Sequence, residues 1–161
     1  MKTVCRVLML SALLTGLAAL AEEKKPSLGM EAVSMDQGQW TDIPGVPGAQ
    51  MKPLHADAGQ APTDLLIRLK KGASSPLHWH SSVESIYTLD GEGEYTMLKT
   101  GEKVTSHPGG FVRMPAHMVH KVRCTSHFKD CVIFIHTAQP FDIHIVDEHG
   151  KPVAEAGAKQ K

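Results

Sequence analysis

The sequence predicts an all-β protein, built as a sandwich or a closed barrel. Short runs rich in β-branched and aromatic residues recur at intervals of about 8–12 residues, which is typical of such folds. Glycine and proline separate the runs, as in Asp90-Gly91-Glu92-Gly93 and His107-Pro108-Gly109-Gly110. No convincing amphipathic helix follows the first 21 residues.

The expected strands follow from alternation of apolar and polar positions. Leu65, Ile67 and Leu69 share one face of an extended segment, and Arg68 lies on the other, which indicates a half-buried strand. The same reasoning predicts strands near residues 40–43, 51–54, 64–71, 84–89, 94–98, 103–106, 111–114, 119–124, 131–136 and 141–146.

The amino-terminal 21 residues have the pattern of a secretion signal. Lys2 and Arg6 precede an apolar run over residues 7–20, and Ala19-Leu20-Ala21 forms a small-x-small cleavage site. An uncleaved membrane anchor is the alternative, but the apolar run is short for a membrane span. We therefore expect a periplasmic or secreted protein without a permanent membrane span. We divide the chain into a signal peptide (1–21), a linker or arm (22–35), a β barrel (36–146) and a flexible tail (147–161).

Composition argues against nucleic acid as a partner. Lys and Arg number 17 and Asp and Glu 17, and cleavage after residue 21 would leave 15 basic against 17 acidic residues, a net charge of −2. Such a chain has no basic footprint for phosphates, and its aromatic content of 5% offers little surface for base stacking.

Two cysteines remain after signal cleavage. Cys124 and Cys131 flank a polar, turn-like segment between two expected strands. An even number of cysteines in an oxidising compartment favours a disulfide, which a hairpin would bring into register. Two free buried thiols, or a role as metal ligands, are the alternatives.

The most informative residues are His78, His80 and Glu84. Residues i and i+2 of a strand point to one face, so the two imidazoles can meet at one point, and Glu84 can add a carboxylate. Nitrogen and oxygen donors of this kind suit one divalent transition metal: Fe, Mn, Ni, Cu or Zn. His120 lies at the start of a later strand and can complete the cluster. Two exposed histidines on a strand would give the same His-x-His pattern.

These residues and their spacing resemble the cupin family. The first cupin motif, Gly-x5-His-x-His-x3-Glu-x6-Gly, is filled by Gly72, His78, His80, Glu84 and Gly91. Most of the second motif is filled by Gly109, Pro115 and His120. The sequence departs from it where His117 replaces a glycine and Cys124 replaces an asparagine.

The resemblance implies a double-stranded β-helix, the cupin jelly-roll barrel, here with an N-terminal strand extension. It implies that His78, His80, Glu84 and His120 are the metal ligands, with further coordination positions open to a small-molecule ligand or substrate. Because family members include dioxygenases, oxalate-cleaving enzymes and sugar isomerases, it favours an oxygenase-type enzyme. A non-catalytic metal- or ligand-binding and sensing module of the cell envelope is the alternative. Trp40 and the segment 136–144 are also similar to the cupin domain of the anti-sigma factor ChrR.

Other positions carry weaker expectations. His117 and His136 are candidates for the pocket or for contacts behind the ligands, although a solvated turn histidine and a hydrogen-bonded core histidine are the respective alternatives. Trp79 should point away from its neighbouring histidines and pack. A homodimer is expected, with residues 36–55 adding a strand to a neighbouring molecule and covering a sheet edge.

Overall fold

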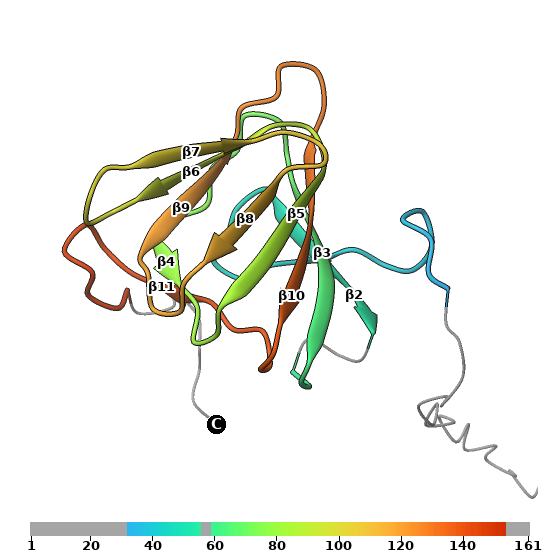
Figure 1. The fold of residues 1–161 in the computed structure, drawn as a ribbon, viewed down its shortest axis with the longest axis horizontal. Coiled ribbons are helices and arrows are strands. Elements are labelled where there is room, and N and C mark those ends of the chain that lie inside the picture. Colours follow the sequence, from blue (N-terminus) through green and yellow to red (C-terminus); the bar gives the residue numbers. More distant parts are fainter. Residues whose placement is uncertain (1–31, 56–58, 154–161) are drawn as a thin grey trace, which may run out of the picture. The chain divides into compact units, whose positions relative to one another are not determined.

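A computed structural model describes residues 32–55 and 59–153, and these residues form two antiparallel β-sheets without a helix. Figure 1 shows the two sheets facing each other, as in a jelly-roll β-sandwich. The all-β prediction is therefore confirmed. The strands are β1 (Thr41–Asp42), β2 (Ala49–His55), β3 (Thr63–Leu69), β4 (His78–Trp79), β5 (Glu84–Asp90), β6 (Gly93–Met97), β7 (Lys103–Ser106), β8 (Phe111–Met114), β9 (His120–Cys124), β10 (Cys131–Thr137) and β11 (His144–Ile145).

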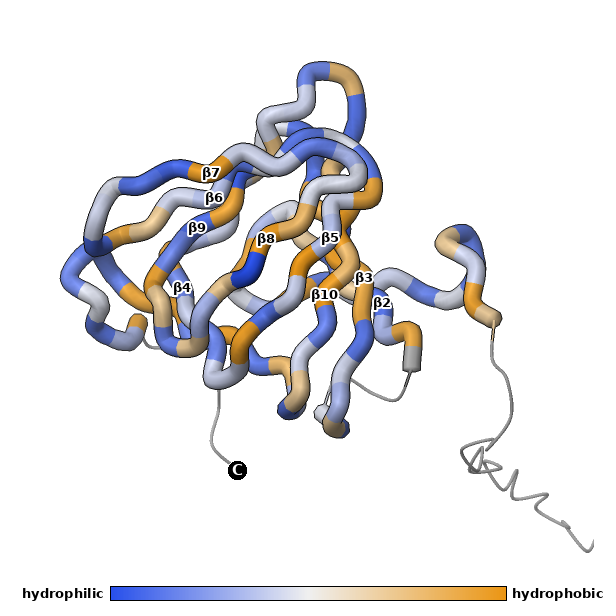
Figure 2. The backbone as a smooth tube through the Cα atoms, viewed as in Figure 1, coloured by the Kyte–Doolittle hydropathy of each residue, from blue (hydrophilic) through white to orange (hydrophobic). Residues whose placement is uncertain are grey.

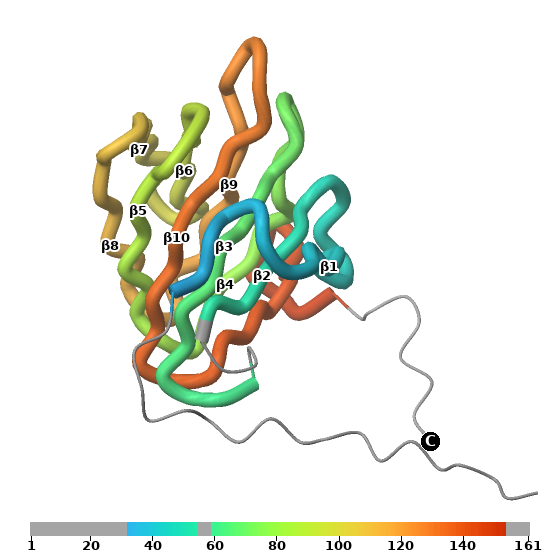
Figure 3. The backbone as a smooth tube through the Cα atoms, turned by 90° about the vertical axis from the view of Figure 1, so that its right-hand side faces the viewer, coloured from blue at the N-terminus to red at the C-terminus, as the bar shows by residue number. Residues whose placement is uncertain are grey.

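The strand order brings distant parts of the chain together. The larger sheet has the order β1-β2-β3-β10-β5-β8, and the smaller sheet has the order β11-β4-β9-β6-β7. Figure 3 views the larger sheet, where β10 lies between β3 and β5. Non-local pairings therefore hold the fold together, and they place the strand of His120 beside the strand of His78.

Alternation along the strands creates the core between the sheets. On β3, β5 and β10 the inward positions include Leu65, Ile86 and Ile135, all at most 3% exposed. Tyr95 on β6 faces them and is fully buried. Apolar and polar residues alternate along several strands in Figure 2, which is the pattern of a sheet with one buried face.

The predicted disulfide is confirmed. Cys124 ends β9 and Cys131 begins β10, their Cα atoms lie 5.6 Å apart, and the sulfur atoms are bonded. Both residues are buried, at 0% and 4% exposure. The bond closes the base of the loop between β9 and β10, which projects at the top of Figure 1.

An N-terminal arm packs on the outer side of β2 and β3. Lys52 on β2 is only 2% exposed, and its Nζ donates hydrogen bonds to the carbonyl groups of Ser34, Met35 and Gln37. The Trp40 ring lies 4.5 Å from the Arg68 guanidinium carbon. Backbone carbonyls thus satisfy an otherwise isolated buried ammonium group.

The predicted signal peptide, residues 1–21, and part of the predicted arm and tail lie outside the described residues. Within the ranges that are described, no helix has the length and apolarity needed to cross a membrane.

Gly91 closes the turn between β5 and β6, and its substitution should be costly. Its φ is +73°, and an added Cβ would lie 2.8 Å from the Asp130 carbonyl oxygen and 2.9 Å from the Cys131 sulfur. Gly91→Ala combines backbone strain of about 1–2 kcal/mol with a steric clash against backbone, so we expect a loss of more than about 2 kcal/mol in urea denaturation.

Gly101→Ala is the matched control for this substitution. Gly101 has a similar φ of +68° but no atom within 4 Å of the added Cβ. It should lose only the strain contribution of about 1–2 kcal/mol. Equal losses in the two variants would show that the contact with the disulfide is not tight.

Candidate metal centre

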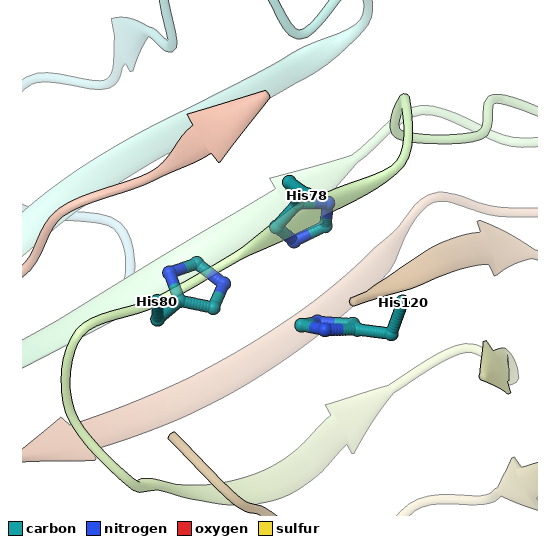
Figure 4. A group of neighbouring side chains, drawn as sticks. All are labelled: His78, His80 and His120. Atoms are coloured by element: carbon teal, nitrogen blue, oxygen red, sulfur yellow. The ribbon is translucent and has the colours of Figure 1, made fainter. Parts of the chain in front are cut away.

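Three histidines from two neighbouring strands meet between the sheets. His78 lies on β4, His80 follows that strand directly, and His120 begins β9 opposite His78. Each ring can offer a nitrogen such that the three nitrogens lie within 4.8 Å of one another. Figure 4 shows the three rings facing a common space. All three residues are at most 5% exposed.

Backbone carbonyls fix the tautomer of each ring. The Nδ1 of His78 lies 2.9 Å from the Pro76 carbonyl oxygen, and the Nδ1 of His120 lies 2.9 Å from that of Met118. The Nδ1 of His80 is hydrogen-bonded to the Asp142 carbonyl. Because a carbonyl oxygen only accepts, each Nδ1 carries the proton, and each Nε2 keeps its lone pair.

The surroundings hold these rings neutral. Burial lowers the pKa of His78 to about 3, helped by the nearby charges of His120 and His80. Burial also lowers the pKa of His80 to about 4, against the opposing hydrogen bond to Asp142. The pKa of His120 is lowered by burial as well. Neutral imidazoles with a free Nε2 are the form that binds a metal ion.

Glu84 reaches the same space from the opposite sheet. It begins β5, is 1% exposed, and its Oε2 lies 3.4 Å from His80 Nε2. Its Oε1 is buried without a hydrogen-bond partner among the described residues. Burial raises the pKa of Glu84 to about 8, with a further contribution from the charge of Asp142. Glu84 lies beside the compact group of three histidines rather than within it.

The donor set fits a divalent transition metal. Three imidazole nitrogens with outer hydrogen bonds to carbonyls are the arrangement that orients histidine ligands in metalloproteins. The unpartnered carboxylate oxygen gives an independent reason, because a buried polar atom without a partner is costly unless something binds it. Carboxylate and imidazole together suit Fe, Mn, Ni, Cu or Zn without selecting among them.

The four side chains line a small cavity between the sheets. Its volume is about 60 Å³. One water molecule needs about 10–15 Å³ by this measure, so the cavity holds only a few non-hydrogen atoms. Most of its lining is apolar. The polar side chains of its lining are those of Ser75, His78, His80, Glu84, Tyr95, His120 and Arg123.

His117 and His136 do not line this cavity. His117 is exposed, and its ring lies 5.0 Å from the Trp79 ring. Its backbone N–H donates a hydrogen bond to the His80 carbonyl oxygen over 2.9 Å. Its φ of +60° is the left-handed conformation for which the cupin motif has glycine, so the turn keeps its shape. His136 projects from the outer face of β10 and pairs with Asp64 over 2.8 Å.

Two residues of the site were not predicted from the sequence. Asp142 follows the last long strand and holds His80 through its carbonyl group, for which a sequence gives no signal. The second is Tyr95, which lines the cavity from β6, and its alternation with Gly93 and Met97 would have indicated an inward position. Trp79, by contrast, packs as predicted, and its ring stacks on that of His144 with centroids 3.9 Å apart.

The fold and the site define a class: a small all-β protein with a buried three-histidine centre suited to a metal ion. Residues 65–136 match the family model of the cupin domain. Residues 65–136 therefore form a cupin domain, as the sequence motifs predict.

Curated relatives match parts of the chain. The L-ectoine synthase of Saccharophagus degradans is 30% identical over 88 residues, which cover 55% of this chain and 65% of that protein. The quercetin 2,3-dioxygenase of Bacillus subtilis is 38% identical over 56 residues, which cover 34% of this chain and 16% of that protein. The chain thus spans less than two thirds of the length of these relatives.

Solved structures share the fold. The polyketide cyclase RemF from Streptomyces resistomycificus superposes with a TM-score of 0.62 at 18% identity, covering 74% of this chain and 87% of that one. An RmlC-like cupin from Shewanella frigidimarina superposes with a TM-score of 0.54 at 20% identity, covering 68% of this chain and 92% of that one. The finer similarity to the ChrR domain stays a prediction.

Proposed function

We propose that this cupin binds one divalent transition metal through His78, His80, Glu84 and His120, and that it acts as an oxygenase-type enzyme on a small organic substrate. One observation carries the proposal. Three neutral imidazoles with free Nε2 atoms and a buried carboxylate with a free oxygen line one cavity. The matches to an L-ectoine synthase and a quercetin 2,3-dioxygenase support chemistry on small molecules in this family.

Each part of the site has a defined role in this proposal. A bound metal ion would supply Lewis-acid or redox chemistry at open coordination positions. The carbonyls of Pro76, Met118 and Asp142 hold the three rings in position. The apolar walls exclude bulk water, which strengthens electrostatic interactions inside the cavity. Phe141, whose ring lies 5.3 Å from that of His80, forms part of this wall.

We also propose that the protein works outside the cytoplasm, as the predicted signal peptide suggests. The disulfide between Cys124 and Cys131 supports this, because such bonds persist mainly in oxidising compartments. A homodimer remains part of the proposal. The two-residue edge strand β1 leaves exposed backbone groups that a second molecule can cover.

A binding or sensing module is the second candidate. The small cavity favours it, because about 60 Å³ leaves little room for a substrate beside a metal ion. Such a module would bind metal, or metal and a small ligand, without turnover.

Metal content and oxygen uptake separate these candidates. We expect one metal ion per chain by elemental analysis, and oxygen uptake with small diketones or oxalate after loading with Fe(II), Mn(II) or Ni(II). Glu84→Gln should reduce turnover at least about 10²-fold, since it removes a proposed ligand charge while keeping the side-chain shape. Stoichiometric metal without turnover across the panel would favour the binding module. Absence of stoichiometric metal would refute both.

A further inference from the structure

Tyr95 carries a polar atom that the fold itself does not use. It lies in the middle of β6, opposite Val122 of β9, and is 0% exposed. Its hydroxyl group is buried and makes no hydrogen bond of ordinary geometry with any described residue. The Thr88 hydroxyl group lies close enough to lower the pKa of the phenol, but it does not meet hydrogen-bond geometry with Tyr95, and its own partner is the Ser106 hydroxyl group, 2.7 Å away. A buried hydroxyl group without a partner destabilises the folded state, so its retention requires a reason.

The position of Tyr95 supplies that reason. The residue lines the same cavity as the three histidines and Glu84. An added Cβ at Gly93 would lie 3.5 Å from the Tyr95 ring, so the ring lies over a position that has no side chain. Burial raises the pKa of the phenol, and the charge of Glu84 raises it further. Tyr95 therefore stays protonated and can donate a hydrogen bond into the cavity.

The cavity also limits what can accept that bond. Its volume of about 60 Å³ admits only a few non-hydrogen atoms. Apolar side chains such as Ile86, Ile133 and Ile135 form much of the lining. Arg123 is a lining residue but is exposed at an outward position of β9. The acceptor that can satisfy Tyr95 is therefore an oxygen atom of a small ligand rather than another described side chain of the lining.

We propose that Tyr95 is a specificity-determining residue whose hydroxyl group donates a hydrogen bond to a carbonyl or hydroxyl oxygen of a short aliphatic ligand. This inference rests on the proposed function, because it assigns the substrate class of the same cavity. The apolar walls take the carbon part of the ligand, and the polar end is selected by Tyr95. A ligand of the same size without an oxygen gains nothing from that hydroxyl group.

Ligand binding to the zinc-loaded protein tests the inference without turnover. Acetone serves as the oxygen-bearing probe and xenon as the apolar probe, both followed by NMR. In Tyr95→Phe we expect acetone to bind about 2- to 10-fold more weakly, the range for one neutral hydrogen bond, and xenon to bind at least as well. Tyr87→Phe is the matched control, because Tyr87 is 48% exposed on β5 and should leave both affinities unchanged.

Two further measurements make the result decisive. The thermal midpoint of ligand-free Tyr95→Phe should not fall, because no hydrogen bond is lost; a purely structural tyrosine would lower it. In the wild-type protein, nuclear Overhauser effects should connect acetone methyl protons to the Tyr95 ring. Equal acetone affinity in wild type and Tyr95→Phe, or no acetone binding to the wild type, would overturn the inference. Metal stoichiometry measured on the same samples separates this failure from failure of the proposed metal site.

Discussion

Replacing His120 with alanine should remove tightly bound metal from the protein. His120 contributes one of three nitrogens within 4.8 Å, and it reaches the site from a different strand than His78 and His80. Loss of an outer hydrogen-bond partner of a ligand typically costs 10–100-fold in metal affinity, so loss of a ligand should cost more than about 100-fold. Competition with a chelator, followed by elemental analysis, measures this change.

His136→Ala is the matched control for this experiment. It also removes an imidazole from a strand, but His136 lies on the outer face of β10 and pairs with Asp64. Its metal affinity should equal that of the wild type. If His120→Ala retained the wild-type affinity while His136→Ala lost metal, the bound ion would lie outside the three-histidine cluster.

Local pattern was sufficient to predict the type of fold and the segments that carry the three clustered histidines. His78 and His80 are one residue apart in an extended segment, so they share a face whatever the rest of the chain does. The strands were predictable because apolar residues alternate along them, as on β3 with Leu65, Ile67 and Leu69. The pairing of Cys124 with Cys131 was predictable because the turn between them is short.

Non-local contacts of the backbone were not predictable in this way. The partner of His80 Nδ1 is a main-chain carbonyl 62 residues further along the chain, and any residue type at position 142 would provide one. The outward position of His136 depends on the register of β10, since a shift by one residue would have turned its imidazole to the cavity. Only the folded arrangement shows that Tyr95 has a buried hydroxyl group without a hydrogen-bond partner among the described residues.

Metal removal should also change how stability depends on pH. In the metal-free protein, burial raises the pKa of Glu84 to about 8, compared with 4.5 for an ordinary glutamate. Between these values the folded state holds a proton that the unfolded state has lost, so stability decreases as pH rises. From pH 6.5 to pH 8 this group alone accounts for roughly 2 kcal/mol.

The histidines act in the opposite direction at lower pH. The pKa values of His78 and His80 are lowered to about 3 and about 4. Below pH 6.5 the unfolded state therefore binds protons that the folded state does not bind. Their contribution becomes complete only well above pH 6.5, the ordinary pKa of histidine, and is lost as pH falls toward the lowered pKa values. The metal-free protein should therefore be most stable near pH 6.5.

A bound cation should abolish the alkaline part of this profile. Its charge favours the carboxylate form of Glu84, so the folded state no longer carries the extra proton above pH 6.5. Urea denaturation at pH 6.5 and pH 8, with and without metal, measures the difference. Metal-free Glu84→Gln is the control, because its amide keeps the shape but does not titrate, so it should lack the decrease in stability that Glu84 causes over this range. Identical profiles for the metal-free wild-type protein and Glu84→Gln would mean that Glu84 is ionised without metal. The carboxylate would then be stabilised by protein groups rather than held ready for a cation.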